Sequence, residues 1–257
     1  MQDENLQSYI FNLPVGGSEA MAFDAPAGGI IGGADIDDLP DGIVTGSNLL
    51  GFSAETTPEL RSSVALCMLA AQRVAANDTV IRTPNEWLDR HNTVLKNLNW
   101  VVEGGGSIKS TFETTGMSVH KAIIPFLTAA LGGGVAAASL ILTALEQLKE
   151  MDKDSPWISL FERESRRFGV SEFQFTLVET SAGETRLKMA AARFDATFGQ
   201  TQILFFRVKK QHATFDMAKS ELRANDELLE SMNKALKVKL ATQTGIYIAS
   251  LDIGDLS

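Results

Sequence analysis

The residues from Gly104 to Thr111 read GGGSIKST and have the composition of a phosphate-binding loop. A glycine-rich turn exposes backbone N–H groups, and a lysine side chain can reach a phosphate oxygen. Such a loop places glycine directly before its lysine, whereas here Ile108 precedes Lys109. The spacing therefore favours a plain flexible loop over a phosphate site.

Four aspartates stand close together in the first part of the chain, and carboxylates are the ligands that calcium prefers. They are Asp35, Asp37, Asp38 and Asp41. An EF-hand loop has glycine at its sixth position, but Pro40 stands there and no glutamate closes the loop. The pattern favours a solvated acidic turn, so we predict no metal site and no cofactor.

The histidines and the cysteine do not form a motif. His91, His120 and His212 each stand alone, so a metal site would need three distant elements to converge. Cys67, the single cysteine, lies on the apolar face of a predicted helix, which favours a packing role. No G-x-S-x-G motif is present, so the sequence predicts no catalytic residue. An enzyme whose site is assembled from scattered residues remains an alternative.

The most unusual feature is a run of 24 uncharged residues, AIIPFLTAALGGGVAAASLILTAL, from Ala122 to Leu145. About 20 apolar residues suffice for a helix to span a bilayer. Pro125 and the glycines at 132–134 would break a straight helix, so we expect a helical hairpin at about 119–148. A helix that is apolar all round must be covered on every side.

Two interpretations of this hairpin follow: it is a central core element, or it is stored in the folded protein and released into a membrane. The side chains that we expect to enter lipid are the large apolar ones, namely Ile123, Ile124, Phe126, Leu127, Leu131, Val135, Leu140, Ile141 and Leu142. Gly132, Gly133 and Gly134 would let helices approach closely, as at membrane-embedded interfaces.

Charge is distributed unevenly along the chain. Residues 1–60 contain ten acidic residues and no Lys or Arg, so the remaining residues carry 23 basic against 22 acidic ones. No basic patch is present to bind a nucleic acid. We expect residues 1–53 to form an extended acidic arm that covers the stored hairpin and loosens when its carboxylates are protonated. The N-terminus lacks the features of a signal peptide, so we expect a soluble protein of unknown compartment, cytoplasmic or exported by another route.

Hydrophobic periodicity predicts the remaining elements. A helix from about Pro58 to Ala76 follows the N-cap Thr57, and a second helix follows Thr83 and Pro84. From residue 171 the period changes to two, which predicts a three-stranded antiparallel meander at 171–217 with a turn at 181–183. A last helix is expected at about 226–251.

Together these patterns predict an α+β fold in which a helical layer surrounds a central apolar hairpin and packs on the β-meander and the C-terminal helix. We expect one compact unit made of the arm (1–53), the helical region (54–168) and the meander with its helix (169–257). The leading function is a non-enzymatic, membrane-interacting protein of toxin or virulence-factor type. The alternative is a homo-oligomeric structural or interaction protein in which the hairpin is ordinary core. The expected partners are a lipid membrane or a second copy of the chain.

Overall fold

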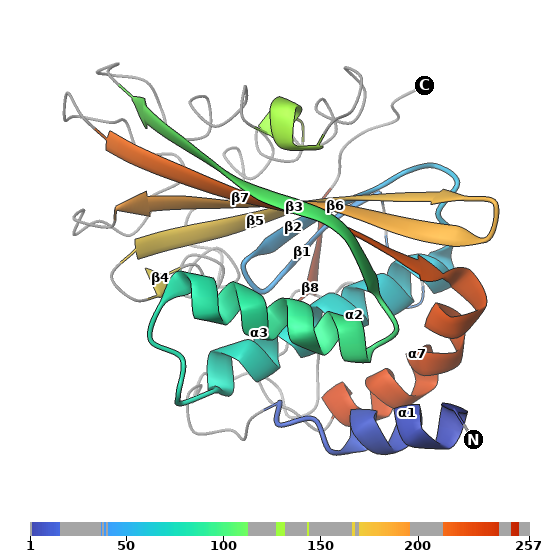
Figure 1. Cartoon of the computed structure of the whole chain (residues 1–257). Helices are drawn as coiled ribbons and strands as arrows, with labels where there is room; N and C mark the ends of the chain where they lie inside the picture. Colours follow the sequence, from blue (N-terminus) through green and yellow to red (C-terminus); the bar gives the residue numbers. More distant parts are fainter. Residues whose placement is uncertain are drawn as a thin grey trace.

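The computed structural model describes residues 2–15, 37, 39, 41–112, 127–131, 143, 166–167, 170–195, 213–241 and 248–251. Within this part of the chain, a single sheet of eight strands crosses the middle of the molecule (Figure 1). The labelled helices α1, α2, α3 and α7 lie on one face of the sheet, and the short helix at residues 127–131 lies on the other (Figure 1). The fold is therefore α+β, as predicted.

The strands come from the whole length of the chain. They are β1 (Gly42–Thr45), β2 (Asn48–Phe52), β3 (Val101–Phe112), β4 (Arg166–Arg167), β5 (Val170–Ser181), β6 (Glu184–Asp195), β7 (Ala213–Asn225) and β8 (Ile248–Leu251). Their order in the sheet is β3-β7-β6-β5-β2-β1-β8, with β4 paired to β5. The β2–β5 pair is parallel and the other described pairs are antiparallel.

The helices begin where local capping chemistry predicts. They are α1 (Gln2–Phe11), α2 (Pro58–Asn77), α3 (Pro84–Asn97) and α7 (Asp226–Ala241). The Leu60 N–H donates to Oγ1 of Thr57 at 3.3 Å, which caps α2. In α3, the Glu86 N–H donates to Oγ1 of Thr83 at 3.2 Å, and the Thr83 N–H donates to Oε2 of Glu86 at 3.0 Å. This reciprocal pair is a capping box, and both predicted helices are confirmed.

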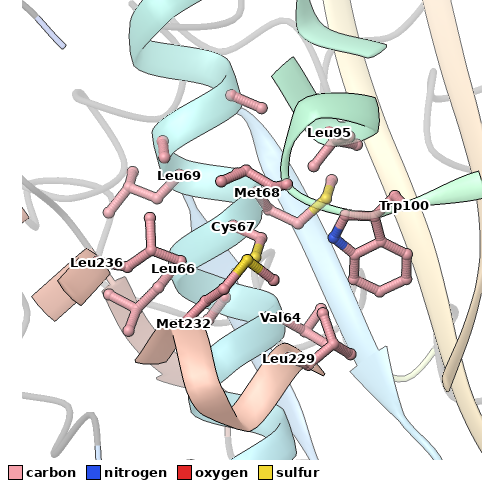
Figure 2. Close-up of a cluster of buried hydrophobic side chains, with 14 of the residues drawn as sticks. Val64, Leu66, Cys67, Met68, Leu69, Leu95, Trp100, Leu229, Met232 and Leu236 are labelled. Atoms are coloured by element: carbon pink, nitrogen blue, oxygen red, sulfur yellow. The ribbon is translucent and has the colours of Figure 1, made fainter. Parts of the chain in front are cut away.

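Helix α2 occupies the centre of the helical layer. It packs against α3, α7 and β1, and its side chains are buried around most of its circumference. Figure 2 shows Cys67 and Met68 of α2 near Met232 of α7 and Trp100. A helix that neighbours cover on all sides can be apolar all round. The described part of this layer is therefore centred on α2. The prediction that the layer surrounds the uncharged stretch stays a prediction, because most of that stretch lies outside the described residues.

Strand β5 is buried on both of its faces. Val178 belongs to the core beneath α2, and Gln174 and Thr176 share its face because side chains alternate along a strand. Phe173 and Phe175 point to the opposite face and are 0% exposed. Both faces of the sheet are therefore core faces at this strand.

The described residues among the first 53 form more regular structure than the extended arm, with at most short strands, that the sequence predicted. They contain α1 and the hairpin of β1 and β2, which lies inside the sheet next to β5. Both short strands are buried throughout, so they lack the polar alternation that marks a half-exposed strand. This absence of alternation is why the sequence did not reveal them.

The sheet that contains the meander is larger than predicted. Strands β5 and β6 form the predicted hairpin around Ala182 and Gly183, whose positive φ angles of 52° and 79° suit a two-residue turn. Its third member is β7, which begins at Ala213, and eight strands replace the expected three. The strand predicted near residues 203–208 lies outside the described residues. The last helix ends at Ala241, and Ile248–Leu251 forms β8 instead of continuing it.

The glycine-rich stretch at 104–106 is part of β3 and not a loop. Its backbone pairs with β7 from Val101 to Phe112, with an irregularity between Val102 and Gly104. A strand conformation does not gather the N–H groups of successive residues around one anion, as a phosphate-binding loop does. The prediction of a flexible loop is therefore wrong. The interpretation of this stretch as a phosphate-binding loop has no structural support.

Candidate functional site

The uncharged stretch is described at residues 127–131 and 143. Residues 127–131 form a short helix in which Leu127, Ala130 and Leu131 are 1%, 3% and 1% exposed. The intervening residues Thr128 and Ala129 are exposed. This helix therefore has one side in the protein and one side in solvent, unlike α2.

The other residues predicted to enter lipid or to pack closely lie outside the described residues. They are Ile123, Ile124, Phe126, Val135, Leu140, Ile141 and Leu142, together with Gly132, Gly133 and Gly134. Of the predicted set, the structure thus places Leu127 and Leu131, and it brings both into the protein interior.

The face of the sheet on the side of this helix is apolar at its centre. Phe173 of β5 pairs with Ala192 of β6, which pairs with Met217 of β7, and all three are buried. Phe175 and Ala190 form the next pair and are also buried. Cross-strand partners share a face of the sheet, so these side chains form a second core on the side away from α2.

The same face is charged near the β5–β6 turn. Lys188 Nζ lies 2.7 Å from Glu179 Oε2, and Arg223 lies 2.6 Å from carboxylate oxygens of both Glu103 and Glu184. These groups are partly exposed and of both signs. This end of the face is therefore a solvated ion-pair network, which contributes little to stability.

The acidic N-terminal segment is held on the helical face of the molecule. Arg61 Nη2 of α2 lies 2.5 Å from Asp41 Oδ1, and its other nitrogens donate to the carbonyls of Leu39 and Thr56 at 3.0 and 2.9 Å. Lys237 of α7 pairs with Asp37. The predicted cover over the hairpin is therefore not seen in the described part of the segment, which contacts α2 and α7.

Two of the four aspartates considered for calcium are thus paired with cations. Asp41 binds Arg61 and Asp37 binds Lys237, while Asp35 and Asp38 lie outside the described residues. Among the residues that the structure describes, no group of three His, Cys, Asp or Glu side chains is placed to hold a metal ion.

Helix α1 is fastened to the same face. Lys239 Nζ donates to the Phe11 carbonyl at 2.7 Å, and Asn97 Nδ2 of α3 donates to the Tyr9 hydroxyl at 3.2 Å. Ile10 and Leu13 are buried in the core around α2. A cation at a helix C-terminus is favourable because the last carbonyls carry partial negative charge.

Cys67 and His91 are packing residues. Cys67 is 0% exposed, and its burial raises the pKa of the thiol to about 12, so the nucleophilic thiolate is not formed near neutral pH. The prediction of a packing role for Cys67 is confirmed. His91 is also buried and stacks on Trp87 with ring centroids 5.3 Å apart. His120 and His212 lie outside the described residues.

Sequence reasoning missed a cluster of buried polar side chains beside the β1–β2 turn. Its members are Thr45, Asn48, Gln72, Gln174 and Thr176, each at most 3% exposed. Single amide residues in strands and helices are usually solvated, so nothing in the sequence pattern marks these as buried.

No helix in the described part of the chain is both long enough and apolar enough to cross a membrane.

No protein-family model and no curated protein sequence matches the chain. Solved structures do match. A delta-endotoxin superposes with a TM-score of 0.38 at 9% identity, covering 81% of this chain and 92% of its own.

Two further solved structures are similar. The Evf virulence factor has a TM-score of 0.36 at 11% identity, covering 97% of this chain and 92% of its own. The activated Cyt2Ba monomer from Bacillus thuringiensis subsp. israelensis has a TM-score of 0.40 at 11% identity, covering 70% of this chain and 98% of its own. Scores below 0.5 at such identities establish neither a shared function nor a shared mechanism.

Proposed function

We propose that the protein is a non-enzymatic, membrane-interacting protein of toxin or virulence-factor type. In this proposal the uncharged stretch at 122–145 is stored in the folded protein and enters lipid when it is released. The stretch is long enough to reach across a bilayer once extended from its stored form. Its apolar side chains would then exchange a protein environment for an equally apolar one.

The observation that carries this proposal is the one-sided burial of the helix at 127–131. Leu127 and Leu131 are kept from water, while Ala129 between them faces solvent. A helix with a solvent side belongs to an outer layer of the molecule. Such a layer can leave the sheet without opening the core around α2, which lies on the opposite face (Figure 1). A hairpin enclosed on every side could leave only if the surrounding core opened.

The proposal is tested by placing a charge where it destabilises the membrane-inserted state but not the folded protein. Ala129→Lys puts an ammonium on the solvent side of the helix, where surface substitutions change stability by about 0.5 kcal/mol or less. At the centre of a membrane-embedded helix the same lysine costs about 2.5–3.5 kcal/mol. We expect dye release from phosphatidylcholine–phosphatidylglycerol vesicles to be at least about tenfold slower than for the parent.

The matched control is Val80→Lys, since Val80 is 79% exposed in the loop between α2 and α3, far from the stretch in sequence. This variant should keep the parent's thermal stability and its rate of dye release. Both variants and the parent are compared at pH 7 and pH 5, because protonation of the acidic segment was expected to promote release. Absence of dye release by the parent at both pH values would refute the proposal.

A second candidate function is self-association, and the edge of the sheet favours it. Within the described part of the chain β3 is an edge strand, and its residues Val101 and Val102 are 52% and 38% exposed. After Glu103, which pairs with Arg223, come Gly104, Gly105 and Gly106, which have no side chains to block a second strand. Natural proteins usually protect such edges with charges or proline. Antiparallel pairing of two copies would set the valines beside the partner's glycines.

Light scattering after size-exclusion chromatography distinguishes this candidate from the first. If β3 pairs two copies, the parent elutes as a dimer, and Val102→Lys shifts it to the monomer because a charged edge disfavours strand pairing. A parent protein that is monomeric at the highest concentration it reaches would exclude this candidate. Vesicle dye release by that monomer would then leave membrane interaction as the function.

A further inference from the structure

The β1–β2 turn is surrounded by uncharged polar side chains in the interior of the protein. Thr45 and Asn48, which flank the turn, are both 0% exposed. Gln72 of α2 and Gln174 of β5 are 3% and 2% exposed. These four residues come from four different elements, and we call them the amide cluster.

Backbone geometry brings the members of the amide cluster together. Asn48 is the register partner of Thr45 in β1 and of Gln174 in β5. The Gln174 N–H donates to the Ser47 carbonyl at 3.0 Å, which holds β5 against the turn. Gln72 reaches the turn from the helical side, since a Cβ built on Gly46 would lie 2.1 Å from its Oε1 atom.

Glycine is favoured at position 46 for two reasons. Its φ angle of +55° lies in the left-handed region, which side chains disfavour. Any Cβ there would also occupy the place of the Gln72 side-chain oxygen. The turn is therefore shaped to let an amide group of α2 approach the backbone of β1 and β2.

Most polar atoms of the amide cluster lack a partner. Within the part of the chain that the structure describes, no hydrogen bond is made by Oγ1 of Thr45, Nδ2 of Asn48 or either polar atom of Gln72 and Gln174. The exception is Oδ1 of Asn48, which accepts from the Thr176 hydroxyl at 3.1 Å. Buried polar atoms in native proteins are nearly always hydrogen-bonded, so a group of such atoms in one place calls for a ligand.

The chemistry of these atoms defines that ligand. The amide nitrogens are donors and the amide oxygens are acceptors, while the Thr45 hydroxyl can act as either. No charged side chain belongs to the amide cluster, so it offers nothing to compensate an ion. The occupant that matches these atoms is neutral and both donates and accepts hydrogen bonds. Water has these properties and typically makes about three hydrogen bonds when it is buried.

We propose that the amide cluster is a binding site for internal water molecules that join α2 to the β1–β2 turn and to β5. The bound water supplies the hydrogen-bond partners that these atoms do not find in the described protein. This site lies on the helical face of the sheet and does not depend on the proposed membrane function. Elsewhere along α2 the contacts are apolar, as Figure 2 shows for Leu66, Cys67 and Met68.

Nuclear magnetic resonance of the isotopically labelled full chain tests the proposal directly. The side-chain amide protons of Gln72 and Gln174 should show nuclear Overhauser effects to water with a residence time longer than that of surface water. In Gln72→Met the effect at Gln174 should weaken, because one wall of the site no longer bonds to water. Absence of any effect at both amides in the parent would overturn the proposal.

Thermal unfolding provides a second readout with a matched control. Met is close to Gln in length but makes no hydrogen bond, so Gln72→Met and Gln174→Met should each lower the melting temperature, because a water molecule bonded to the amide loses a buried partner. Thr176→Val removes the donor to Asn48, a bond the cluster already makes, and should lower the melting temperature by several degrees. If both Gln→Met variants are at least as stable as the parent, the amides make no bond to water, and the proposal fails.

Discussion

The two faces of the sheet are both buried, but they are built and closed differently. On the helical face, α2 is enclosed by α3, α7 and the sheet, and ion pairs hold the acidic segment against it. On the other face, the described covering element is a short helix with one side in solvent. The first arrangement is closed by contacts on every side, whereas in the second the described covering helix is buried on one side alone.

Along β5, the polar side chains point toward the more enclosed face of the sheet, and the aromatic side chains point toward the face with the outer helix. Along β5, Gln174 and Thr176 point toward the enclosed helical face, and Phe173 and Phe175 point toward the face with the outer helix. The helical face tolerates polar groups because the amide cluster can be satisfied by bound molecules. At its centre the other face is held by apolar contact, and its ion pairs lie at the end near the β5–β6 turn.

The strongest test of this comparison removes an aromatic side chain from each face. Phe175→Ala on the outer-helix face and Phe52→Ala on the helical face each delete a ring that is 0% or 1% exposed. Each should lower the free energy of unfolding by about 3–5 kcal/mol, as measured by urea denaturation. A loss of less than about 1 kcal/mol for Phe175→Ala would show that this face is not a true core.

The next test concerns the attachment of the acidic segment to the helical face. Arg61→Ala removes the partner of Asp41 and two donors to backbone carbonyls, and the Arg61 side chain is only 13% exposed. We expect a loss of about 2 kcal/mol in urea denaturation, because charged hydrogen bonds of a largely buried group are lost.

Arg186→Ala is the control on the other face, since Arg186 is 50% exposed and lies 3.6 Å from Glu184. An exposed pair of this kind contributes about 0–1 kcal/mol. Equal losses in the two variants would contradict the view that the ion pairs close the helical face more firmly than the charged end of the opposite face.

A smaller effect is expected at the start of α3. Thr83→Ala removes the side-chain acceptor that caps the helix, and N-cap substitutions of this kind cost about 1 kcal/mol. The outer-helix face should be unaffected, so vesicle dye release should match that of the parent. A change in dye release would mean that the two faces are coupled.

Local signals in the sequence were sufficient for α2 and α3, although they did not reveal α1. Thr57 with Pro58, and Thr83 with Pro84, mark the starts of α2 and α3 because capping involves only neighbouring residues. The β5–β6 hairpin was also predictable, since the turn at 182–183 separates two alternating runs. These elements do not depend on distant contacts.

The missed elements depend on pairing between distant parts of the chain. Strand β2 joins β5 in parallel although Asn48 and Gln174 are far apart in the sequence, and β8 joins β1 from the opposite terminus. The glycines of β3 have low strand propensity and are held extended by their ladder with β7. The amide cluster requires the same long-range pairing, so no local pattern could reveal it.

The smallest predicted effect is the pH dependence of the α3 cap. Hydrogen bonds from the backbone N–H groups of Arg82 and Thr83 and from the Thr83 hydroxyl lower the pKa of Glu86 below its usual value. Because the pKa is lower in the folded state, this carboxylate stabilises the protein above its unfolded pKa, and the contribution is lost as pH falls through the folded value. The melting temperature of Glu86→Gln should therefore fall less than that of the parent between pH 6 and pH 3.

The vesicle assay at pH 5 should not distinguish the two proteins, because the cap lies on the helical face. If Glu86→Gln alone altered dye release at pH 5, the acid response would originate on the enclosed face, and the division of roles between the faces would be wrong.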